Sequence, residues 1–561
     1  MQLKPKTATV LLLIVFGLAV FLRFWGLNGV DVQHDAALYS VRALGWFDFL
    51  AGQEQTSPII WFGQIPGWAY LSFHDHPPLV FLIQFLFLNF FGQSSFATLL
   101  SFGLAGIATT WLLYFTLAKL HSKETGLLAA LLFTLSAYSI WINRTGFLEG
   151  IEILLTTASA AVFLFFLKRN DFRLFFLWAF LTGLALLAKY TALFLLPAAI
   201  LYLLIWRRDV FKRKEFWLAL VLLVIVLLPV IIYNTMVFQT RGHFDAALSS
   251  MVGMNPDDYS VLKRRVNFNP LGNIWSVATS FTDVSSLSFA LLYLAGLLFC
   301  LLTAIKEKIN RLKNFTLINI ALIVAMFAFA DASPRFSTIL LPFATIVLTL
   351  CLYELAIKFA HRKQLLIIAA AVLAIIFCYE LAYNLNTNIL KKPFGAESVL
   401  YSRHRFYDVG FNELDRYLKK NAYGLLPKKR TVTELTKETT TYDIAGREMI
   451  LFDDRPKWNS RMWYVHRYQT YYNVPLVYLT DLVSAAGEDQ EITNVLARTG
   501  ATGVWFIVGQ GRGIDTTDLS HYNAMMDRLT GDLEAQGIEP VQKIYDYDDE
   551  VSFNIYHFSL K

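Results

Sequence analysis

Side chains that can accept a proton are concentrated in the polar stretch that follows the first apolar run of this 561-residue chain. Asp31 and Asp35 come early in the stretch, with Tyr39 close behind, and the pair Asp75-His76 stands near its end. A carboxylate or imidazole that is held in place can take a proton from a hydroxyl group in a transition state. The stretch therefore predicts a site for proton transfer.

Asp35 stands at the start of a helical pattern. Apolar residues recur after it at helical spacing, at Leu38, Val41, Leu44 and Phe47. This spacing predicts an amphipathic helix that lies on a membrane surface, with Asp35 as its N-cap. Capping alone would explain the aspartate, but a cap there is also a carboxylate held at a fixed height beside lipid headgroups. Asp35 is the leading candidate for a base.

The run His74-Asp75-His76 offers a metal site as one interpretation, since imidazole and carboxylate are ordinary ligands. Three potential ligands in successive residues, with no further histidine partner, favour a simpler interpretation. Pro77-Pro78 ends an extended segment and begins the helix that follows.

Charged residues also stand at the edges of later apolar runs. They are Arg144 with Glu149 and Glu152, then Lys189, and then Arg335 with Asp331. Any one of them is explained equally well as an anchor that reaches toward the headgroups. Arginine and lysine also form charge-assisted hydrogen bonds to phosphate. If these edges face the same side, Arg144, Lys189 and Arg335 predict a site for an anion.

The composition shows which solvent these residues meet. The chain is 56% hydrophobic and 16% charged, with a mean hydropathy of +0.46, so it is an integral membrane protein. The net charge of +6 lies mostly in short segments between apolar runs, a pattern of membrane topology that implies no nucleic acid. Cys300, Cys351 and Cys378 lie in or beside apolar runs, so no disulfide framework is available to the polar segments.

Eleven apolar runs are long enough to cross a bilayer, which takes about 20 helical residues. They lie near residues 8–25, 96–118, 125–142, 150–167, 172–188, 190–206, 215–233, 286–304, 314–330, 335–357 and 364–384. The first resembles a signal peptide, but Arg23-Phe24-Trp25 follows where small residues for cleavage would be needed, so we expect a retained span. Residues 79–91 are shorter and fit either a span or an interfacial helix.

Basic loops fix the orientation. If residues 79–91 do not cross, the N-terminus and the basic loops all share one side, which must be cytoplasmic. Those loops are residues 119–124, 168–173, 207–214, 306–313 and 358–363. The odd number of spans then places the segment after residue 384 outside. The charged edges at Arg144, Lys189 and Arg335 also face outward, which favours one anionic site.

The predicted fold class is a polytopic α-helical membrane protein of about 11 spans with a C-terminal extracytoplasmic α/β domain. Residues 1–384 form the transmembrane domain, with external loops at 26–95 and 234–285, and residues 385–561 form the soluble domain. In that domain, strand-like runs at 449–452, 474–479 and 503–508 alternate with helical stretches at 485–498 and 520–536, and 541–560 resembles a hairpin. This alternation favours a parallel sheet covered by helices.

The order of motifs resembles the GT-C glycosyltransferases of the protein O-mannosyltransferase and aminoarabinose-transferase (ArnT-like) type. The motifs are Asp35-Ala36-Ala37-Leu38-Tyr39, Asp75-His76-Pro77-Pro78-Leu79, Arg144 with Glu149, Gly183-Leu184-Ala185-Leu186-Leu187-Ala188-Lys189-Tyr190, and Ser333-Pro334-Arg335-Phe336. The resemblance covers roughly the first 385 residues and is strongest up to about residue 205.

The resemblance implies a plasma-membrane enzyme that moves a hexosyl or pentosyl group from a polyprenyl-phosphate sugar to an acceptor hydroxyl, with inversion. The acceptor is a protein, a lipid or a glycan. The family's catalytic acid falls on Asp35. Asp31, Asp75, His76, Tyr39 and Glu149 are the candidates for a supporting acid or for binding the acceptor. Arg144, Lys189 and Arg335 are the candidates for holding the donor phosphate.

The chain departs from the family pattern at three of these positions. Ala36 replaces a second acid that often follows the first, so Asp35 acts alone or with Asp31 or Asp75. His76 stands where a basic residue often precedes the prolines, and Glu149 stands in place of an aspartate.

A transporter and a non-catalytic membrane anchor are the alternatives. A transporter should show broken or charged helices near the midplane and an internal repeat, whereas here the charges gather at one face. An anchor would not need eleven spans. Glu149 and Glu152 are weak candidates for binding Mg²⁺ or Mn²⁺, and the mannosyltransferase-like pattern favours no required metal.

Overall fold

The computed structural model describes residues 4–45, 76–254, 269–304, 310–329, 333–391, 408–424, 426, 444–456, 458–486, 492–511, 514 and 520–560. The chain divides into two compact units. The helical unit comprises Met1–Leu27, Leu50–Gly92 and Ala97–Ser402, and the α/β unit comprises Asn28–Phe49, Gln93–Phe96 and Arg403–Lys561. The predicted candidates Asp75 and Asp331 lie outside the described residues.

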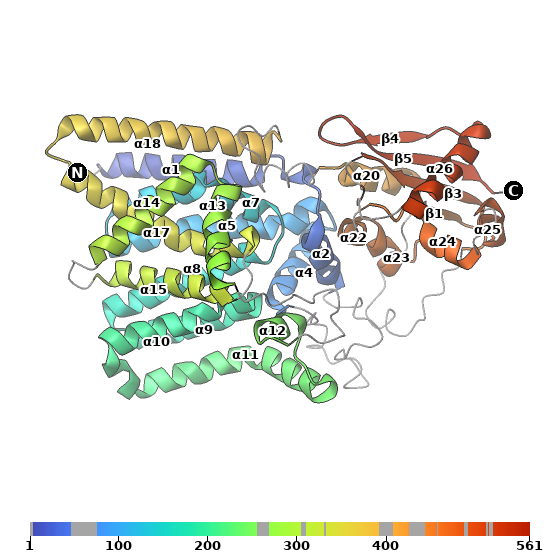
Figure 1. Ribbon diagram of the computed structural model, residues 1–561. Coiled ribbons are helices and arrows are strands. Elements are labelled where there is room, and N and C mark those ends of the chain that lie inside the picture. Colours follow the sequence, from blue (N-terminus) through green and yellow to red (C-terminus); the bar gives the residue numbers. More distant parts are fainter. Residues whose placement is uncertain are drawn as a thin grey trace. The chain divides into compact units, whose positions relative to one another are not determined.

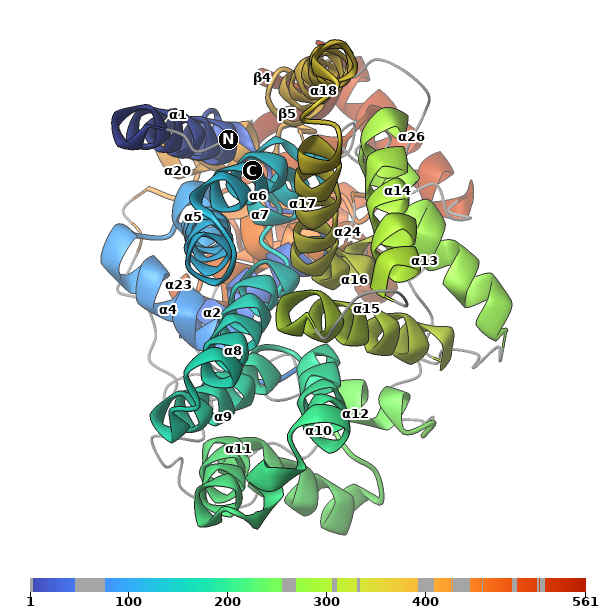
Figure 2. The same ribbon diagram turned by 90° about the vertical axis from the view of Figure 1, so that its left-hand side faces the viewer.

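The helical unit is built from helices that lie side by side (Figures 1 and 2). They are α1 (Pro5–Phe24), α4 (Leu79–Phe91), α5 (Ser95–Leu120), α6 (Lys123–Leu135), α7 (Ala137–Arg144), α8 (Glu149–Arg169), α9 (Phe172–Ala188), η3 (Tyr190–Phe194), α10 (Leu195–Trp206), η4 (Arg208–Lys212), α11 (Lys214–Arg241), α12 (Ala246–Met251), α13 (Pro270–Val284), α14 (Leu287–Ala304), α15 (Arg311–Phe329), α16 (Pro334–Ser337), η6 (Thr338–Leu340), α17 (Leu341–Lys358), α18 (Lys363–Asn384) and η7 (Leu385–Ile389).

Within the described ranges, eight helices are long and apolar enough to cross a membrane. The bent pair α6 and α7, which meet at 61°, makes a ninth candidate. The apolar helices Phe172–Ala188 and Tyr190–Trp206 coincide with two further predicted spans but are shorter than the eight. Leu79–Phe91 is the remaining short apolar helix. The polytopic helical fold is confirmed.

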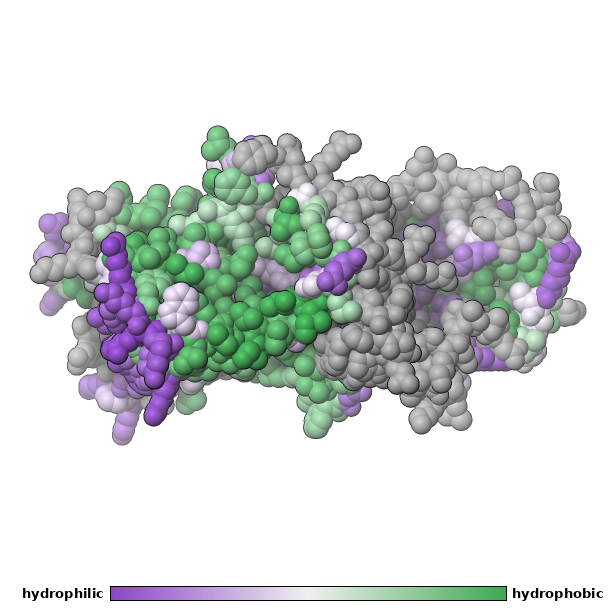
Figure 3. Space-filling view, turned by 90° about the horizontal axis from the view of Figure 1, so that it is seen from below, coloured by the Kyte–Doolittle hydropathy of each residue, from purple (hydrophilic) through white to green (hydrophobic). Residues whose placement is uncertain are grey.

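Burial separates the helices that pack inside this unit from those that face lipid. The most apolar stretch of α8 is 72% buried, whereas that of α11 is 28% buried and that of α18 is 6% buried. Figure 2 shows α8 and α17 toward the middle of the bundle and α11 and α18 at opposite edges. Figure 3, viewed from the α11 side, shows a hydrophobic face that ends in a cluster of hydrophilic side chains. Such a surface matches a hydrocarbon layer bounded by headgroups.

The α/β unit contains a five-stranded sheet in the order β2-β1-β3-β5-β4. The strands are β1 (Glu448–Phe452), β2 (Leu476–Tyr478), β3 (Gly503–Gly509), β4 (Gln542–Tyr545) and β5 (Val551–Ser559). β1 is parallel to β2 and β3, and β5 is antiparallel to β3 and β4. The parallel part and the closing hairpin are as the alternation of the sequence predicts.

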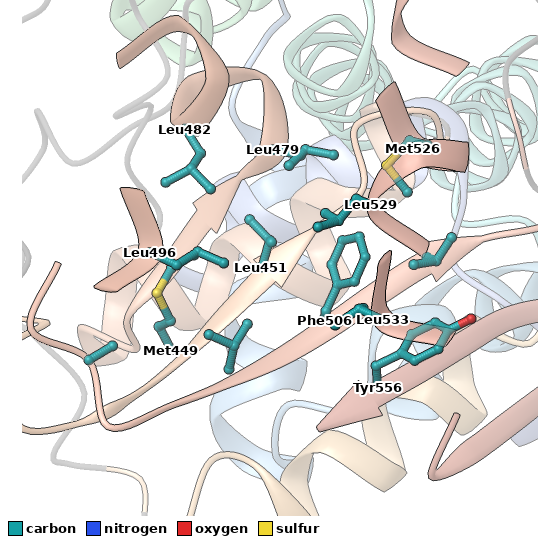
Figure 4. Close-up of a cluster of buried hydrophobic side chains, with 13 residues drawn as sticks. Met449, Leu451, Leu479, Leu482, Leu496, Phe506, Met526, Leu529, Leu533 and Tyr556 are labelled. Atoms are coloured by element: carbon teal, nitrogen blue, oxygen red, sulfur yellow. The ribbon is translucent and has the colours of Figure 1, made fainter. Parts of the chain in front are cut away.

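Helices cover one face of this sheet. They are α24 (Leu479–Ala486), α25 (Ile492–Arg498) and α26 (Ser520–Ala535). Figure 4 shows their apolar side chains, Leu482, Leu496 and Leu529 among them, packed against Leu451 and Phe506 of the strands. Alternate residues of a strand point to one face, so the apolar residues at this spacing in β1 and β3 form this core.

The other face carries α20 (Phe411–Asn421), whose Phe411 ring contacts Phe553 of β5. The same unit contains α22 (Trp458–Arg461), η8 (Met462–His466), α23 (Arg467–Tyr472) and, from the first polar loop, α2 (His34–Gly45).

Two predictions about α2 are wrong. The helix begins at His34, so Asp35 lies in its first turn rather than at the N-cap. The helix also packs against α22 and η8, with all but a few of its side chains buried, instead of lying as an amphipathic helix on a membrane surface. Apolar spacing alone does not distinguish a helix face that meets lipid from one that meets protein.

Asp415 holds a buried ion pair in the α/β unit. Both of its oxygens lie 2.8 Å from Arg467 Nη2, and Lys419 Nζ lies 2.9 Å away. Burial alone would raise the pKa of Asp415, but the charges of Arg467 and Lys419 outweigh it and hold the pKa below its usual value. The stability that the pair contributes is therefore present above the unfolded pKa of about 3.9 and is lost as the pH falls below it.

Replacing Asp415 with Asn should destabilise the protein by about 3–5 kcal/mol at neutral pH, because Arg467 stays buried without its partner. Thermal unfolding of the full chain, followed by tryptophan fluorescence, measures this, and the gap from the wild type should shrink below about pH 4. Glu413→Gln is the matched control on the same helix, because its pair with Arg416 is exposed. Equal losses in the two variants would contradict the assignment.

Candidate active site

Glu149, the first residue of α8, is the centre of a buried charge cluster. Its Oε1 accepts hydrogen bonds from Lys189 Nζ at 2.5 Å and from Arg335 Nε at 2.7 Å. Glu149 is fully buried, and Lys189 and Arg335 are 7% and 9% exposed. The structure thus brings together three of the predicted site residues, which are up to 186 positions apart in sequence.

Lys189 and Arg335 both stand at helix ends, from which their side chains reach Glu149. Lys189 follows the last residue of α9 in extended conformation, so the chain turns away from the helix at this residue. Arg335 lies in α16, where Ser333 caps the helix through its side chain and Pro334 occupies the first turn. Both cations also lie over aromatic rings, Lys189 over Phe336 at 4.0 Å and Arg335 over Phe147 at 4.4 Å. These rings exclude water from one side of each charge.

The second oxygen of Glu149 differs from the first in its hydrogen bonding. Oε2 is buried and has no hydrogen-bond partner among the described residues. A buried carboxylate oxygen without a donor is costly, and a ligand that carries a hydroxyl group would satisfy it.

Glu152 lies next to this cluster, three residues further along α8. It is 1% exposed, and its Oε1 accepts a hydrogen bond from the Thr191 hydroxyl. The part of the chain that the structure describes contains no group of three or more His, Cys, Asp or Glu residues that could hold a metal ion. Oε1 of Glu149 contacts Lys189 and Arg335, and Oε1 of Glu152 contacts Thr191.

Arg144 has a different environment from the one predicted. Its Nη1 donates to the backbone carbonyls of Leu22, Arg23 and Trp25 at the end of α1, at 2.9–3.2 Å. A cation at a helix C-terminus satisfies the last carbonyls and complements the helix dipole. Its position as a donor-phosphate ligand stays a prediction.

Sequence reasoning missed Arg23. The residue is fully buried, with Nε bonded to Asn143 Oδ1 at 3.0 Å and Nη2 to Ser139 Oγ at 3.2 Å. It therefore joins α1 to α7, and the pattern that could have revealed it is a charge inside an apolar run.

Asp245, the N-cap of α12, is another residue that the sequence did not single out. Its Oδ2 accepts hydrogen bonds from Tyr190 at 2.6 Å and Asn234 at 2.8 Å, and its Oδ1 accepts one from the Leu248 backbone. Burial raises the pKa of its carboxyl group, and these bonds and the nearby His76 oppose the rise. Because Tyr190 follows Lys189 directly, Asp245 fixes the segment that carries Lys189 to the loop after α11.

Asp31 and Asp35 of the first loop lie in the α/β unit. Asp35 is partly buried in the first turn of α2, and Tyr39 of the same helix is 1% exposed. Asp31 is buried, and both of its oxygens accept backbone N–H groups of residues 409–412. His76, by contrast, belongs to the helical unit with Glu149.

Replacing Glu149 with Gln should lower stability more than replacing Lys189 with Ala. The first change removes the carboxylate that both buried cations contact, a cost of about 3–5 kcal/mol, whereas the second leaves Glu149 paired with Arg335. Thermal unfolding of the two detergent-solubilised variants compares them directly. A larger loss in Lys189→Ala would show that Glu149 does not hold the cluster together.

Solved structures share this architecture. ArnT from Cupriavidus metallidurans, in the apo state, aligns over 98% of this chain and 97% of its own, with a TM-score of 0.54 and 13% identity. Its undecaprenyl phosphate complex aligns with a TM-score of 0.52. The Archaeoglobus fulgidus oligosaccharyltransferase in complex with Zn and sulfate aligns over 97% of this chain and 73% of its own, with a TM-score of 0.51 and 14% identity. The chain therefore shares the fold of these ArnT and oligosaccharyltransferase structures.

Sequence comparison matches only part of the chain, but at higher identity than the solved structures. Residues 75–233 match the family model for dolichyl-phosphate-mannose-protein mannosyltransferase. A putative mannosyltransferase, YycA of Bacillus subtilis (strain 168), is 30% identical over 153 residues, and an uncharacterized protein of Aquifex aeolicus (strain VF5) is 34% identical over 135 residues. These matches span 22% and 30% of the two relatives. They confirm the resemblance to mannosyltransferase-type and ArnT-like GT-C proteins.

Proposed function

We propose that this protein is an inverting glycosyltransferase that moves a sugar from a polyprenyl-phosphate donor to an acceptor hydroxyl at the outer face of the plasma membrane. The observation that carries the proposal is the buried cluster in which Lys189 and Arg335 both contact the carboxylate of Glu149. Two cations held in one buried cluster can bind a phosphate through charge-assisted hydrogen bonds. The ArnT structure with bound undecaprenyl phosphate supports a lipid-phosphate donor.

The reaction needs a base as well as an anion site. The acceptor oxygen attacks the anomeric carbon, the bond from that carbon to the phosphate oxygen breaks, and the phosphate leaves with the bonding electrons. Asp35 takes the proton of the acceptor hydroxyl. Because an unperturbed carboxylate is a weak base toward an alcohol, it must act by positioning and by taking the proton late in the reaction. Lys189 and Arg335 stabilise the phosphate as its charge develops.

Glu149 has a second role in this proposal. Its Oε2, which no described donor satisfies, accepts a hydrogen bond from a hydroxyl group of the bound sugar or acceptor. Binding of the substrate would then remove the cost of a buried, unsatisfied oxygen, and this gives the site preference for a hydroxyl-bearing ligand over a bare lipid phosphate.

The composition of the α/β unit supports this orientation. Because this unit contains both α2, from the first polar loop, and the C-terminal residues, we expect both on the same side of the membrane. The eleven spans that the sequence predicts agree with this, because all of them except α1 lie between α2 and the C-terminal residues, and ten is an even number of crossings. Leu79–Phe91 as an additional span would make the number odd. The basic N-terminus and loops then place α2 and the C-terminal residues outside.

Cysteine labelling tests this orientation in a background without Cys300, Cys351 and Cys378. Asp209→Cys, in an exposed loop position between α10 and α11, should resist an impermeant reagent added to intact cells. Lys420→Cys, exposed on α20, should react. The reverse pattern would place the proposed site on the cytoplasmic face.

The activity is tested by incubating the purified protein in lipid nanodiscs with a panel of polyprenyl-phosphate sugars and measuring which donor is consumed. We expect turnover of at least one donor by the wild type and none by Asp35→Asn, which removes the base but keeps the side-chain volume. Glu413→Gln, an exposed acid in the same unit, should retain full activity. Substantial turnover by a folded Asp35→Asn protein would remove Asp35 from the mechanism.

A binding assay tests the phosphate site separately from the transfer reaction. Lys189→Ala and Arg335→Ala should each weaken the affinity for a polyprenyl phosphate about 10-fold or more, since a charge-assisted hydrogen bond contributes about 1.5–3 kcal/mol. Equilibrium binding of a fluorescent polyprenyl phosphate measures this, with Asp35→Asn as a control of unchanged affinity. Unchanged affinity in both alanine variants would refute a phosphate site at this cluster.

A further inference from the structure

The helix that carries Asp35 is held at its start by residues almost 400 positions later. The Asp31 carboxylate accepts hydrogen bonds from the backbone N–H groups of Val409, Phe411 and Asn412, at 2.8–3.1 Å. Phe411 is the first residue of α20, so Asp31 provides the negative charge that the N-terminus of that helix favours. Asp31 is only 4% exposed. This bond set fixes the segment that leads directly into α2.

Two tyrosines hold α2 itself. The backbone N–H of Val32 donates to the Tyr464 hydroxyl at 2.7 Å, just before α2 begins. Near the other end of the helix, the Tyr471 hydroxyl donates to the carbonyl of Val41 at 3.1 Å. Tyr464 and Tyr471 are each 1% exposed. A Cβ added at Gly45 would lie 2.5 Å from the Tyr471 hydroxyl oxygen, so this glycine permits the close approach.

A helix as short as α2 does not hold its own position. It has 12 residues, a length at which an isolated helix is marginal in water. It packs against α22 and η8 of the same unit. The place of Asp35 is therefore determined by the C-terminal part of the chain.

We propose that the C-terminal residues 403–561 are a positioning element of the transfer reaction, in which Asp31, Tyr464 and Tyr471 hold α2 so that Asp35 meets the acceptor hydroxyl. This inference rests on the proposed function. It assigns these three residues as positioning residues and gives the soluble part of the chain a role in catalysis. Loosening α2 should reduce the rate of the chemical step and leave the binding of the lipid donor unchanged, because Lys189 and Arg335 are not altered.

The test compares two buried tyrosine hydroxyls that stand four residues apart. Tyr464→Phe removes the acceptor for Val32, whereas Tyr468→Phe removes a hydroxyl that donates to Asp415 and makes no described bond to α2. We expect kcat to fall about 10- to 100-fold in Tyr464→Phe, as small misplacements of a reacting group do, with unchanged KM for the donor. Tyr468→Phe should lower the unfolding temperature and keep kcat close to that of the wild type.

Hydrogen exchange gives a readout that does not depend on activity. Amides of residues 34–45 should exchange faster in Tyr464→Phe and in Asp31→Asn than in the wild type and Tyr468→Phe, while peptides of α8 and α17 stay unchanged. Equal kcat and equal exchange in Tyr464→Phe and Tyr468→Phe would overturn the proposal. If the wild type turns over no donor but Tyr464→Phe exchanges faster, the proposed function is refuted, whereas the claim that Tyr464 positions α2 is supported.

Discussion

The structure of the proposed site depends on the burial of one carboxylate between two cations. The positive charges of Lys189 and Arg335 offset the cost of burying the Glu149 carboxylate, and Glu149 in turn offsets the cost of burying the two cations. The three residues come from the start of α8, the end of α9 and the start of α16. Their attraction therefore holds three helix ends together. The end of α9 at Ala188 and the start of α16 at Pro334 allow both cations to reach the same oxygen. Asp245 extends this order to the loop after α11 through Tyr190.

The chemistry-bearing residues are divided between the two units of the chain. The helical unit supplies the cations and Glu149, which suit a phosphate and a hydroxyl group. The α/β unit supplies Asp35, on a helix held by Asp31, Tyr464 and Tyr471. In the proposed transfer, the α/β unit supplies the acid and the helical unit supplies the anion site. Residues 28–49 of the first polar loop and the C-terminal residues belong to one compact unit.

The sequence predicted the features that long patterns encode. Apolar runs of about 20 residues gave the spans, and alternating short runs gave the strands from β1 to β5. It could not predict contacts between distant residues. The charges of Glu149, Lys189 and Arg335 indicated a shared side but not a shared oxygen, and Arg144 turned out to cap α1. The helices α20, α22 and α23 were missed. With four and six residues, α22 and α23 are too short to show a helical period. Asp31 was placed among the candidate acids, but only the fold reveals that α20 begins at its carboxylate.

The central claim is that Lys189 and Arg335 bind the donor phosphate. An experimental structure of the protein with bound polyprenyl phosphate tests it most directly. The account predicts phosphate oxygens within about 3 Å of Lys189 or Arg335. A phosphate bound away from both cations would contradict it.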